Sequence, residues 1–182
     1  YKTASPTIRA KDKGLAAATP KSLERWVFEV VKVESPVHVS EAARRIFSKA
    51  GVRRPSKEIL QAMDDAFGKL VESGRAARRG DFLWSADMKQ APVRDRTGLQ
   101  PAIRKLEMVS DEELAEAVCV VVEQSYGIAK GQAPTLVFKL LGYGRTNQAM
   151  KDRFNDRVNN LLSDGHLRDD GEHLLPAVPL SN

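Results

Sequence analysis

One order of predicted elements occurs twice in this chain: a helix, a short helix, a longer helix ended by glycine, and a β-hairpin. The run Leu70-Val-Glu-Ser-Gly74, ahead of Gly80-Asp-Phe-Leu-Trp84, parallels Leu161-Leu-Ser-Asp-Gly165, ahead of Gly171-Glu-His-Leu-Leu175. Two copies of so irregular an order rarely arise by chance. Three helices closed by a hairpin follow the winged-helix plan, a helix-turn-helix with a β wing. The sequence therefore predicts a mainly α, α+β fold of tandem winged helix-turn-helix domains.

The first copy carries clear helix starts and stops. Thr19 is a good N-cap, and Pro20 suits the first helical position because its missing N–H has no partner there anyway. Ser40 and Ser56 are predicted to cap the second and third helices, and Gly51 to end the second. The predicted inward stripe of the third helix is Ile59, Leu60, Met63, Phe67 and Leu70.

The second copy is marked in the same way. Ser110 and Glu113 have the spacing of a capping box, in which each side chain bonds the other's backbone N–H. Thr146 is predicted to cap the longer helix. The alternation of apolar and polar residues over 102–109 predicts an extended segment before the first helix.

The length of 182 residues suits two small domains of about 70–80 residues each. The predicted organisation is a flexible basic leader (1–18), a first winged-helix domain (19–87), a linker (88–101), a second winged-helix domain (102–178) and a tail (179–182). The leader and linker are assigned on their Lys, Arg, Pro and Gly content and their lack of an apolar period.

Composition removes several function classes. A single cysteine, Cys119, rules out a disulfide within the chain, and no apolar run reaches the roughly 18 residues of a membrane helix. The three histidines lack metal-ligand spacing, and no phosphate-binding glycine loop or Ser/His/Asp order is present. We therefore expect a cytoplasmic, non-enzymatic protein with no cofactor, metal, small-molecule substrate or membrane partner.

The charge predicts where nucleic acid would bind. The net charge is +5, yet acids outnumber bases over residues 110–182. In a winged helix the start of the third helix faces the major groove and the wing reaches phosphates. In the first domain these surfaces, with the second helix, hold the candidate residues Arg44, Arg45, Arg53, Arg54, Lys57, Gln61, Arg75, Arg78 and Arg79.

The second domain offers a weaker candidate surface: Arg145, Asn147, Gln148 and Lys151. Its wing carries Asp169, Asp170 and Glu172, which would repel phosphate, so we expect protein contact or structural support from this domain. DNA is the expected partner of the first domain, with RNA also open.

Two other interpretations stay open. The basic residues could form an ordinary solvated surface, and the chain would then be a protein–protein or intramolecular scaffold that contacts other domains of a parent protein. An enzyme is the third interpretation, supported only by scattered carboxylates.

Several strings resemble a bacterial domain of unknown function at the C-terminal end of very large proteins, over roughly residues 22–165. They are Glu34-Ser-Pro-Val-His38 with Ala43-Arg-Arg-Ile46, Gly80-Asp-Phe-Leu-Trp84, Pro92-Val-Arg-Asp-Arg96, Ile103-Arg-Lys-Leu-Glu107 and Leu140-Leu-Gly-Tyr143. Ser35 stands where that family usually has glycine. Those proteins carry a superfamily-one DNA/RNA helicase module and often a Vsr-like nuclease fold. The resemblance thus implies an accessory module beside enzymes that act on nucleic acid, and it supplies no catalytic residues.

Overall fold

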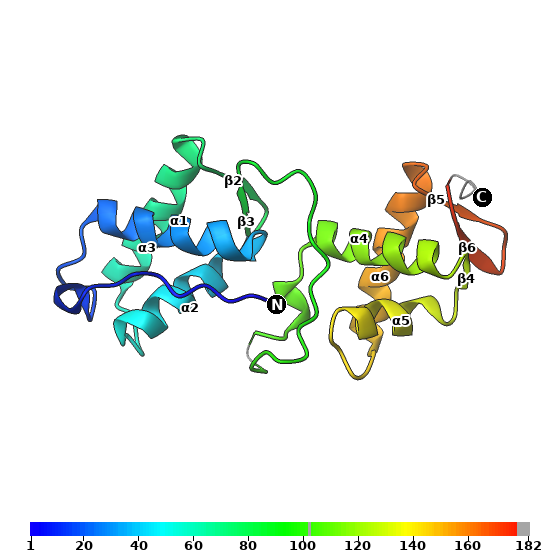
Figure 1. Cartoon of the computed structure of the whole chain (residues 1–182), viewed down its shortest axis with the longest axis horizontal. Helices are drawn as coiled ribbons and strands as arrows, with labels where there is room; N and C mark the ends of the chain where they lie inside the picture. The colour runs from blue at the N-terminus through cyan, green and yellow to red at the C-terminus, as the bar shows by residue number, and fades with distance from the viewer. Residues whose placement is uncertain (102, 178–182) are drawn as a thin grey trace. The chain divides into compact units, whose positions relative to one another are not determined.

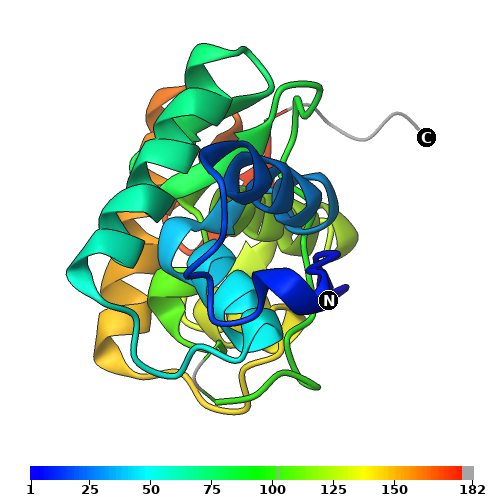
Figure 2. The same ribbon diagram turned by 90° about the vertical axis from the view of Figure 1, so that its left-hand side faces the viewer.

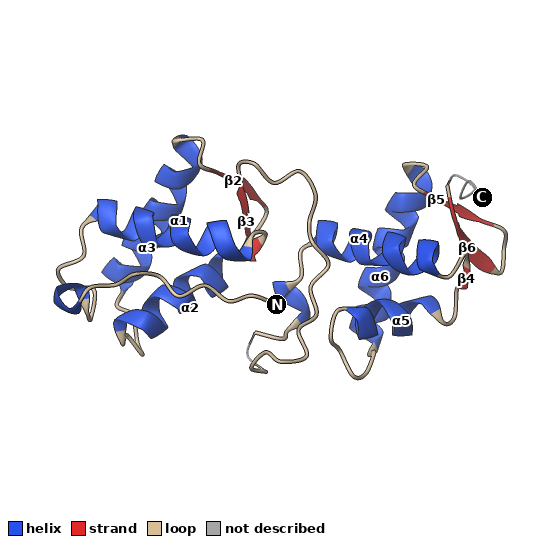
Figure 3. Cartoon of the chain, in the orientation of Figure 1, coloured by secondary structure: helices blue, strands red, loops and turns tan. Residues whose placement is uncertain are grey.

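The computed structural model describes residues 1–101 and 103–177. Within them it has six α-helices and two three-stranded antiparallel sheets, which confirms the α+β class. The chain divides into two compact units, called here the N-terminal unit (Lys2–Lys89) and the C-terminal unit (Gln90–Asn182). Figure 1 labels the elements and Figure 3 separates helices from strands. No helix in the described part of the chain is both long and apolar enough to cross a membrane.

The N-terminal unit has three helices around one small sheet. Its elements are η1 (Ala10–Asp12), α1 (Pro20–Glu34), β1 (Val37–His38), α2 (Val39–Ala50), α3 (Lys57–Glu72), β2 (Ala76–Arg79) and β3 (Phe82–Ser85). The hairpin β2–β3 is confirmed, with Arg79 opposite Phe82. The two-residue strand β1 joins it through Val37 opposite Leu83, giving the sheet order β1-β3-β2.

The predicted caps of the N-terminal unit are mostly correct. Thr19 and Ser56 accept hydrogen bonds from the backbone N–H groups of Ser22 and Ile59, as N-caps do. Gly51 ends α2 in the left-handed conformation with φ of 76°. The prediction for Ser40 is wrong, because α2 begins at Val39 and the ring nitrogen of His38 accepts from the Ser40 N–H.

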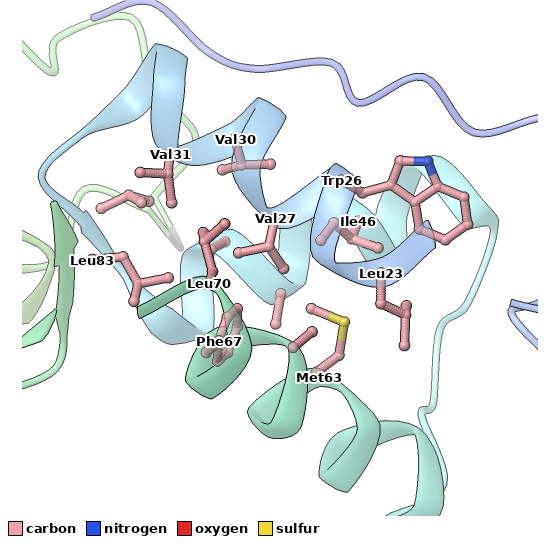
Figure 4. Packing of buried hydrophobic residues seen from close by; sticks show 14 of the residues in the cluster. Leu23, Trp26, Val27, Val30, Val31, Ile46, Met63, Phe67, Leu70 and Leu83 are labelled. Carbon is pink, nitrogen blue, oxygen red and sulfur yellow. The ribbon is translucent and has the colours of Figure 1, made fainter. Parts of the chain in front are cut away.

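The core of this unit lies between α1 and α3. Figure 4 shows Leu23, Val27 and Val30 of α1 facing Met63, Phe67 and Leu70 of α3. Trp26 and Ile46 are fully buried in the same cluster. Leu60, predicted to face inward, is instead 49% exposed. The stripe at Ile59, Met63, Phe67 and Leu70 already fills the seam, and Leu60 lies at the edge of this stripe, on the side toward Asp64.

Residues 2–18, predicted to be a flexible leader, pack against the N-terminal unit in the structure. They run as a lead-in segment along their own unit, drawn in dark blue in Figures 1 and 2. The Trp26 indole N–H donates to the carbonyl oxygen of Thr7 at 3.0 Å, and the Ala4 N–H donates to the Glu34 carboxylate at 2.8 Å. Leu15 is buried in the core. Ala4, Ile8 and Ala18 pack against the same core. Tertiary hydrogen bonds and these apolar contacts therefore hold a segment that has no apolar period of its own.

The C-terminal unit repeats the arrangement. Its elements are η2 (Leu106–Met108), α4 (Asp111–Gln124), β4 (Ile128–Ala129), α5 (Ala133–Leu140), α6 (Gln148–Ser163), β5 (Leu167–Asp169) and β6 (His173–Pro176). The sheet order is β4-β6-β5, the same as in the first unit. The prediction for Thr146 is wrong by one residue, because Asn147 caps α6 by accepting from the Met150 N–H. The predicted tail, 179–182, lies outside the described residues.

The two units correspond residue by residue without a net insertion. Equivalent positions have one constant separation along the chain in the pairs Thr19 and Ser110, Val37 and Ile128, Gly51 and Gly142, Gly74 and Gly165, and Gly80 and Gly171. The same separation pairs the buried Met63 with Phe154, and Leu83 with Leu174. Each residue of one unit can therefore be compared with its counterpart in the other.

The predicted linker and the predicted extended segment also differ from the structure. Residues 90–101 pack on the C-terminal unit, where Ala91 and Arg96 are buried. Among residues 103–109 the chain forms turns and the short η2 helix rather than a strand. Lead-in segments thus precede α1 and α4 alike, and the duplicated unit is longer than its helices and hairpin.

Glu113 fixes this second lead-in segment. Ser110 caps α4 as predicted, but Glu113 does not complete the capping box. Its carboxylate instead accepts hydrogen bonds from the guanidinium groups of Arg96, at 2.7 Å for each oxygen, and Arg94, at 2.5 Å. Glu113 and Arg96 are both completely buried. A buried carboxylate between two arginines gains more from them than from a backbone N–H at the helix end.

This network makes the stability of the C-terminal unit depend on pH. Burial alone would raise the pKa of Glu113, but hydrogen bonds from Arg96 and Arg94 outweigh it and lower that pKa. A lowered pKa stabilises the fold above the unfolded value of about 4.3, and this stability is lost as the pH falls through the folded value. We expect the denaturant concentration at the unfolding midpoint, measured by circular dichroism, to decrease when the pH is lowered below about 4. In Glu113→Gln this acid-dependent part should be absent; an unchanged acid dependence would contradict the assignment.

Candidate nucleic-acid interface

The exposed face of α3 gathers four of the predicted residues. Lys57 and Gln61 are one helical turn apart, and Asp64 continues the same face. Arg53 and Arg54 lie in the turn directly before the helix, with exposed side chains. Among the described residues, Arg53, Arg54 and Lys57 make no side-chain hydrogen bond or ion pair. These three cations are therefore available to an anionic partner.

The hairpin brings Arg78 to the same face. Its guanidinium lies 3.6 Å from the Asp64 carboxylate, and the two side chains are 40% and 66% exposed. Its Nε also donates to the Gly80 carbonyl oxygen, at 3.2 Å. An exposed ion pair contributes about 0–1 kcal/mol, so phosphate can compete for Arg78 at little cost. Gln61 is similarly engaged at the surface, donating to Asp65 at 3.0 Å.

Arg79 is arranged differently from Arg78. Its guanidinium carbon lies 4.1 Å from the centre of the Trp84 ring, in cation–π geometry. Trp84 is almost fully buried, so the ring is a support for Arg79 rather than a platform for bases. The guanidinium therefore lies over the ring, next to the turn between β2 and β3.

Arg44 and Arg45 belong to the packing of α2. Arg45 donates to Glu34 at 2.7 Å and lies 2.9 Å from Glu41, and its side chain is 11% exposed. Arg44 also binds Glu41, at 2.7 Å for each oxygen. Both carboxylates are buried and need these cations, because an unpaired buried charge is strongly destabilising. Of the two, only Arg44 has enough exposed surface to reach a ligand.

Arg75 lies away from the α3 face. It is bound to Glu24 of α1 at 2.8 Å and stacks on the Phe28 ring at 4.0 Å. The nine candidate residues of the N-terminal unit thus separate into an exposed set (Arg53, Arg54, Lys57, Gln61, Arg78 and Arg79) and a paired set (Arg44, Arg45 and Arg75). The local sequence pattern indicates only the pairing with Glu41, which lies three and four residues before Arg44 and Arg45. Glu24 and Glu34 are distant along the chain from the arginines that they bind.

The matching surface of the C-terminal unit lacks most of these cations. At positions equivalent to Lys57, Gln61, Arg78 and Arg79 it has Gln148, Asp152, Asp169 and Asp170. The secondary candidates Arg145, Asn147, Gln148 and Lys151 are exposed at the start of α6, where Gln148 donates to Asp152 at 2.7 Å.

The β5–β6 hairpin of the C-terminal unit carries fixed negative charge. A hydrogen bond from Lys130 and another from the Gly171 N–H lower the pKa of Asp169. Backbone hydrogen bonds from His173 and Glu172 lower the pKa of Asp170. Both carboxylates are therefore ionised at neutral pH, at the place where the N-terminal unit carries Arg78 and Arg79.

Other chemistry in the described chain is sparse. Burial, followed by the nearby charges of Glu116 and Glu123, raises the pKa of the Cys119 thiol to about 11, which keeps it protonated and a poor nucleophile at neutral pH. Within residues 1–101 and 103–177, no three His, Cys, Asp or Glu side chains are grouped so that they could hold a metal ion.

Comparison with known proteins gives one match. A family model matches residues 15–60, about a quarter of the chain. That family is described as a protein of unknown function (DUF3320). The matched stretch covers the end of the first lead-in segment, α1, β1, α2 and the start of α3. It supports the part of the predicted resemblance that concerns a domain of unknown function; the helicase and nuclease context stays a prediction. No curated protein and no solved structure matches the chain.

Proposed function

We propose that this chain is a pair of winged-helix domains in which the N-terminal unit docks on nucleic acid, most simply duplex DNA. Two observations support this fold assignment in both units. The elements follow the order helix, strand, two helices and hairpin, and the second strand of the hairpin is the central strand of the sheet. In it α2 and α3 form the helix-turn-helix, and the turn between β2 and β3 is the wing tip.

The charge difference between the two units carries the proposal. Among the eight cationic candidates of the N-terminal unit, Arg54 alone has a permanently charged basic counterpart, Arg145. Arg44 and Arg45 neutralise buried carboxylates of the N-terminal unit. The same backbone plan is built in the C-terminal unit without counterparts of Arg53, Lys57, Arg78 and Arg79, so the fold does not require these four exposed cations. A cluster that folding does not require, on the face a winged helix presents to DNA, is best explained by a polyanionic partner.

The contacts would be made mainly with phosphate. Arg53, Arg54 and Lys57 lie at the start of α3, where the positive end of the helix dipole also favours phosphate. Arg78 and Arg79 reach the backbone from the wing. Gln61 is the one uncharged candidate on this face and could read a base edge after leaving Asp65.

A salt titration tests the proposal. We expect Arg53→Ala, Arg54→Ala and Lys57→Ala together to weaken binding of a fluorescent DNA duplex about tenfold or more. The slope of log affinity against log salt should fall by about 0.9 for each phosphate contact removed. Arg78→Ala with Arg79→Ala should act in the same direction.

The C-terminal unit supplies the matched control. Arg145→Ala with Lys151→Ala removes exposed cations from the equivalent helix start and should leave the affinity and slope nearly unchanged. Equal losses from both sets of substitutions would mean diffuse attraction instead of a docking face. Absence of salt-dependent binding to DNA and to RNA would reject the proposal.

A scaffold function is the second candidate, favoured by Leu60. This side chain is 49% exposed beside Lys57 and Gln61, and an exposed leucine on such a face suits a protein partner. The acidic wing of the C-terminal unit fits the same function. Recovery of a neighbouring domain of the parent protein, lost in Leu60→Ser, with no binding to any nucleic acid, would favour it.

In either case we propose a non-catalytic, cytoplasmic module of a longer protein. The resemblance to the C-terminal end of large helicase proteins supports a parent enzyme of the helicase or nuclease type, with other domains of that parent as partners. The module would then hold the catalytic domains near their nucleic-acid substrate.

A further inference from the structure

Three adjoining hollows line one flank of α3 in the N-terminal unit. Their volumes are about 380, 90 and 680 Å³. The first two share Ala18, Leu23 and Ala62, and the last two share Pro20 and Lys69. They therefore form one groove between α3 and residues 15–25. This flank is not the proposed DNA face, because Ala62 and Lys69 lie more than a quarter of a turn around α3 from Lys57 and Asp64.

The groove changes character along its length. Leu15, Ile59 and Ala62 line its more apolar end, together with the polar side chains of Ser56 and Glu58. The other end is lined by the cations Lys21, Arg25, Lys69 and Arg75, against the single carboxylate of Glu24, which is bound to Arg75 at 2.8 Å. Arg25 is also paired with Glu29, at 3.7 Å, and Asp65 lines the adjoining hollow. The positive charge of this end therefore comes mainly from Lys21 and Lys69, which form no ion pair with any described residue.

The cationic end is not required by the fold. At positions equivalent to Lys21, Arg25 and Lys69, the C-terminal unit has Glu112, Glu116 and Asn160. The two units thus differ in charge on this flank as they do on the α3 face, which indicates a ligand particular to the N-terminal unit.

We propose that this groove binds an acidic peptide segment of a partner protein, with apolar side chains in the end lined by Leu15 and Ile59 and carboxylates beside Lys21 and Lys69. Charge complementarity selects the acidic half of the peptide, and the hollows at Ala18 and Ala62 receive the apolar half. A nucleic-acid backbone is charged along its whole length and would leave the apolar end without a matching contact. This is a second site, separate from the proposed DNA face.

Selection from a display library of random peptides on the 182-residue chain tests the groove. We expect enrichment of peptides that carry Asp or Glu next to large apolar residues. Binding of a selected peptide, measured by fluorescence anisotropy, should weaken about tenfold or more in Lys21→Glu with Lys69→Glu, because like charges then face each other. The control pair Lys11→Glu with Lys32→Glu makes the same charge change at exposed positions outside the groove and should leave the affinity unchanged.

A third variant tests the apolar end. Ala62→Gln narrows this end and should weaken binding of the selected peptide, while binding of the DNA duplex stays unchanged. The melting temperature of the variant checks that its fold is intact. Failure to enrich acidic peptides, or selected peptides that bind the Lys21→Glu, Lys69→Glu variant normally, would overturn the proposal. If that variant loses the DNA duplex as strongly as the peptide, the groove belongs to the nucleic-acid surface instead.

Discussion

Replacing Glu113 with alanine is expected to destabilise the C-terminal unit by about 3–5 kcal/mol. The substitution removes the carboxylate that faces Arg94 and Arg96 and leaves the completely buried Arg96 guanidinium without its counter-charge. It also frees the lead-in segment, since the backbone N–H of Arg94 donates to the same carboxylate at 3.0 Å. One side chain thus holds both the charge balance and the position of residues 94–96.

The two tryptophans make this measurement specific to one unit. Trp26 and Trp84 both belong to the N-terminal unit, so tryptophan fluorescence follows that unit, and circular dichroism follows both. In Glu113→Ala, part of the helical signal should be lost at a lower denaturant concentration than in the unsubstituted chain. Glu107→Ala removes a surface carboxylate 3.3 Å from Lys105 and should change stability by less than about 1 kcal/mol. Equal effects of the two substitutions would contradict the role of Glu113.

Replacing Gly142 with alanine is the second substitution with a large expected effect, about 3 kcal/mol or more. Gly142 has φ of +89°, a left-handed conformation that costs an L-residue about 1–2 kcal/mol. In addition, an alanine Cβ would lie 2.5 Å from the backbone nitrogens of Arg96 and Thr97. These atoms cannot rotate away as a flexible side chain can, so the lead-in segment must move. The hydrogen bond from the Arg96 N–H to the Leu141 carbonyl oxygen, at 3.2 Å, would then be lost.

The equivalent Gly51 separates these two costs. It also has a positive φ, of 76°, but a Cβ there meets nothing within 4 Å. Gly51→Ala should therefore cost only the conformational part, about 1–2 kcal/mol, in the N-terminal unit. Denaturant unfolding of both variants, followed by circular dichroism and tryptophan fluorescence, gives the comparison. If Gly142→Ala costs no more than Gly51→Ala, the close approach of residues 95–97 does not stabilise the unit.

The strings that carry the predicted family resemblance are explained by packing. Glu34 and Arg45 form one ion pair, and the Ser35 hydroxyl accepts a hydrogen bond from the Ser85 N–H of β3. In the C-terminal unit, Arg94 and Arg96 of one string bind Glu113, and the backbone of Arg96 closely approaches Gly142 of another string. These residues hold each unit together, which agrees with a resemblance that supplied no catalytic residues.

The candidate interface was only partly readable from the sequence. The cations at the start of α3 and in the wing were found because helix caps and a glycine turn mark those positions locally. The pairing of Arg75 with Glu24, and of Arg45 with Glu34, was missed because no local pattern indicates which distant carboxylate lies beside a guanidinium. The apolar pattern of α3 predicts an inward Leu60, but the buried stripe of this helix does not extend as far as Leu60.

The sequence by itself determined the duplicated order of helices and hairpins, since apolar periodicity, N-caps and glycine stops act over a few neighbouring residues. Only the tertiary structure decided three other features: the pairing of β1 and β4 with the hairpins, which completes the sheets; the lead-in segments packed on each unit; and the division of the arginines into exposed and paired sets. Each of these depends on atoms that are distant along the chain and close in space, and the energies of burial and ion pairing follow distance in space alone.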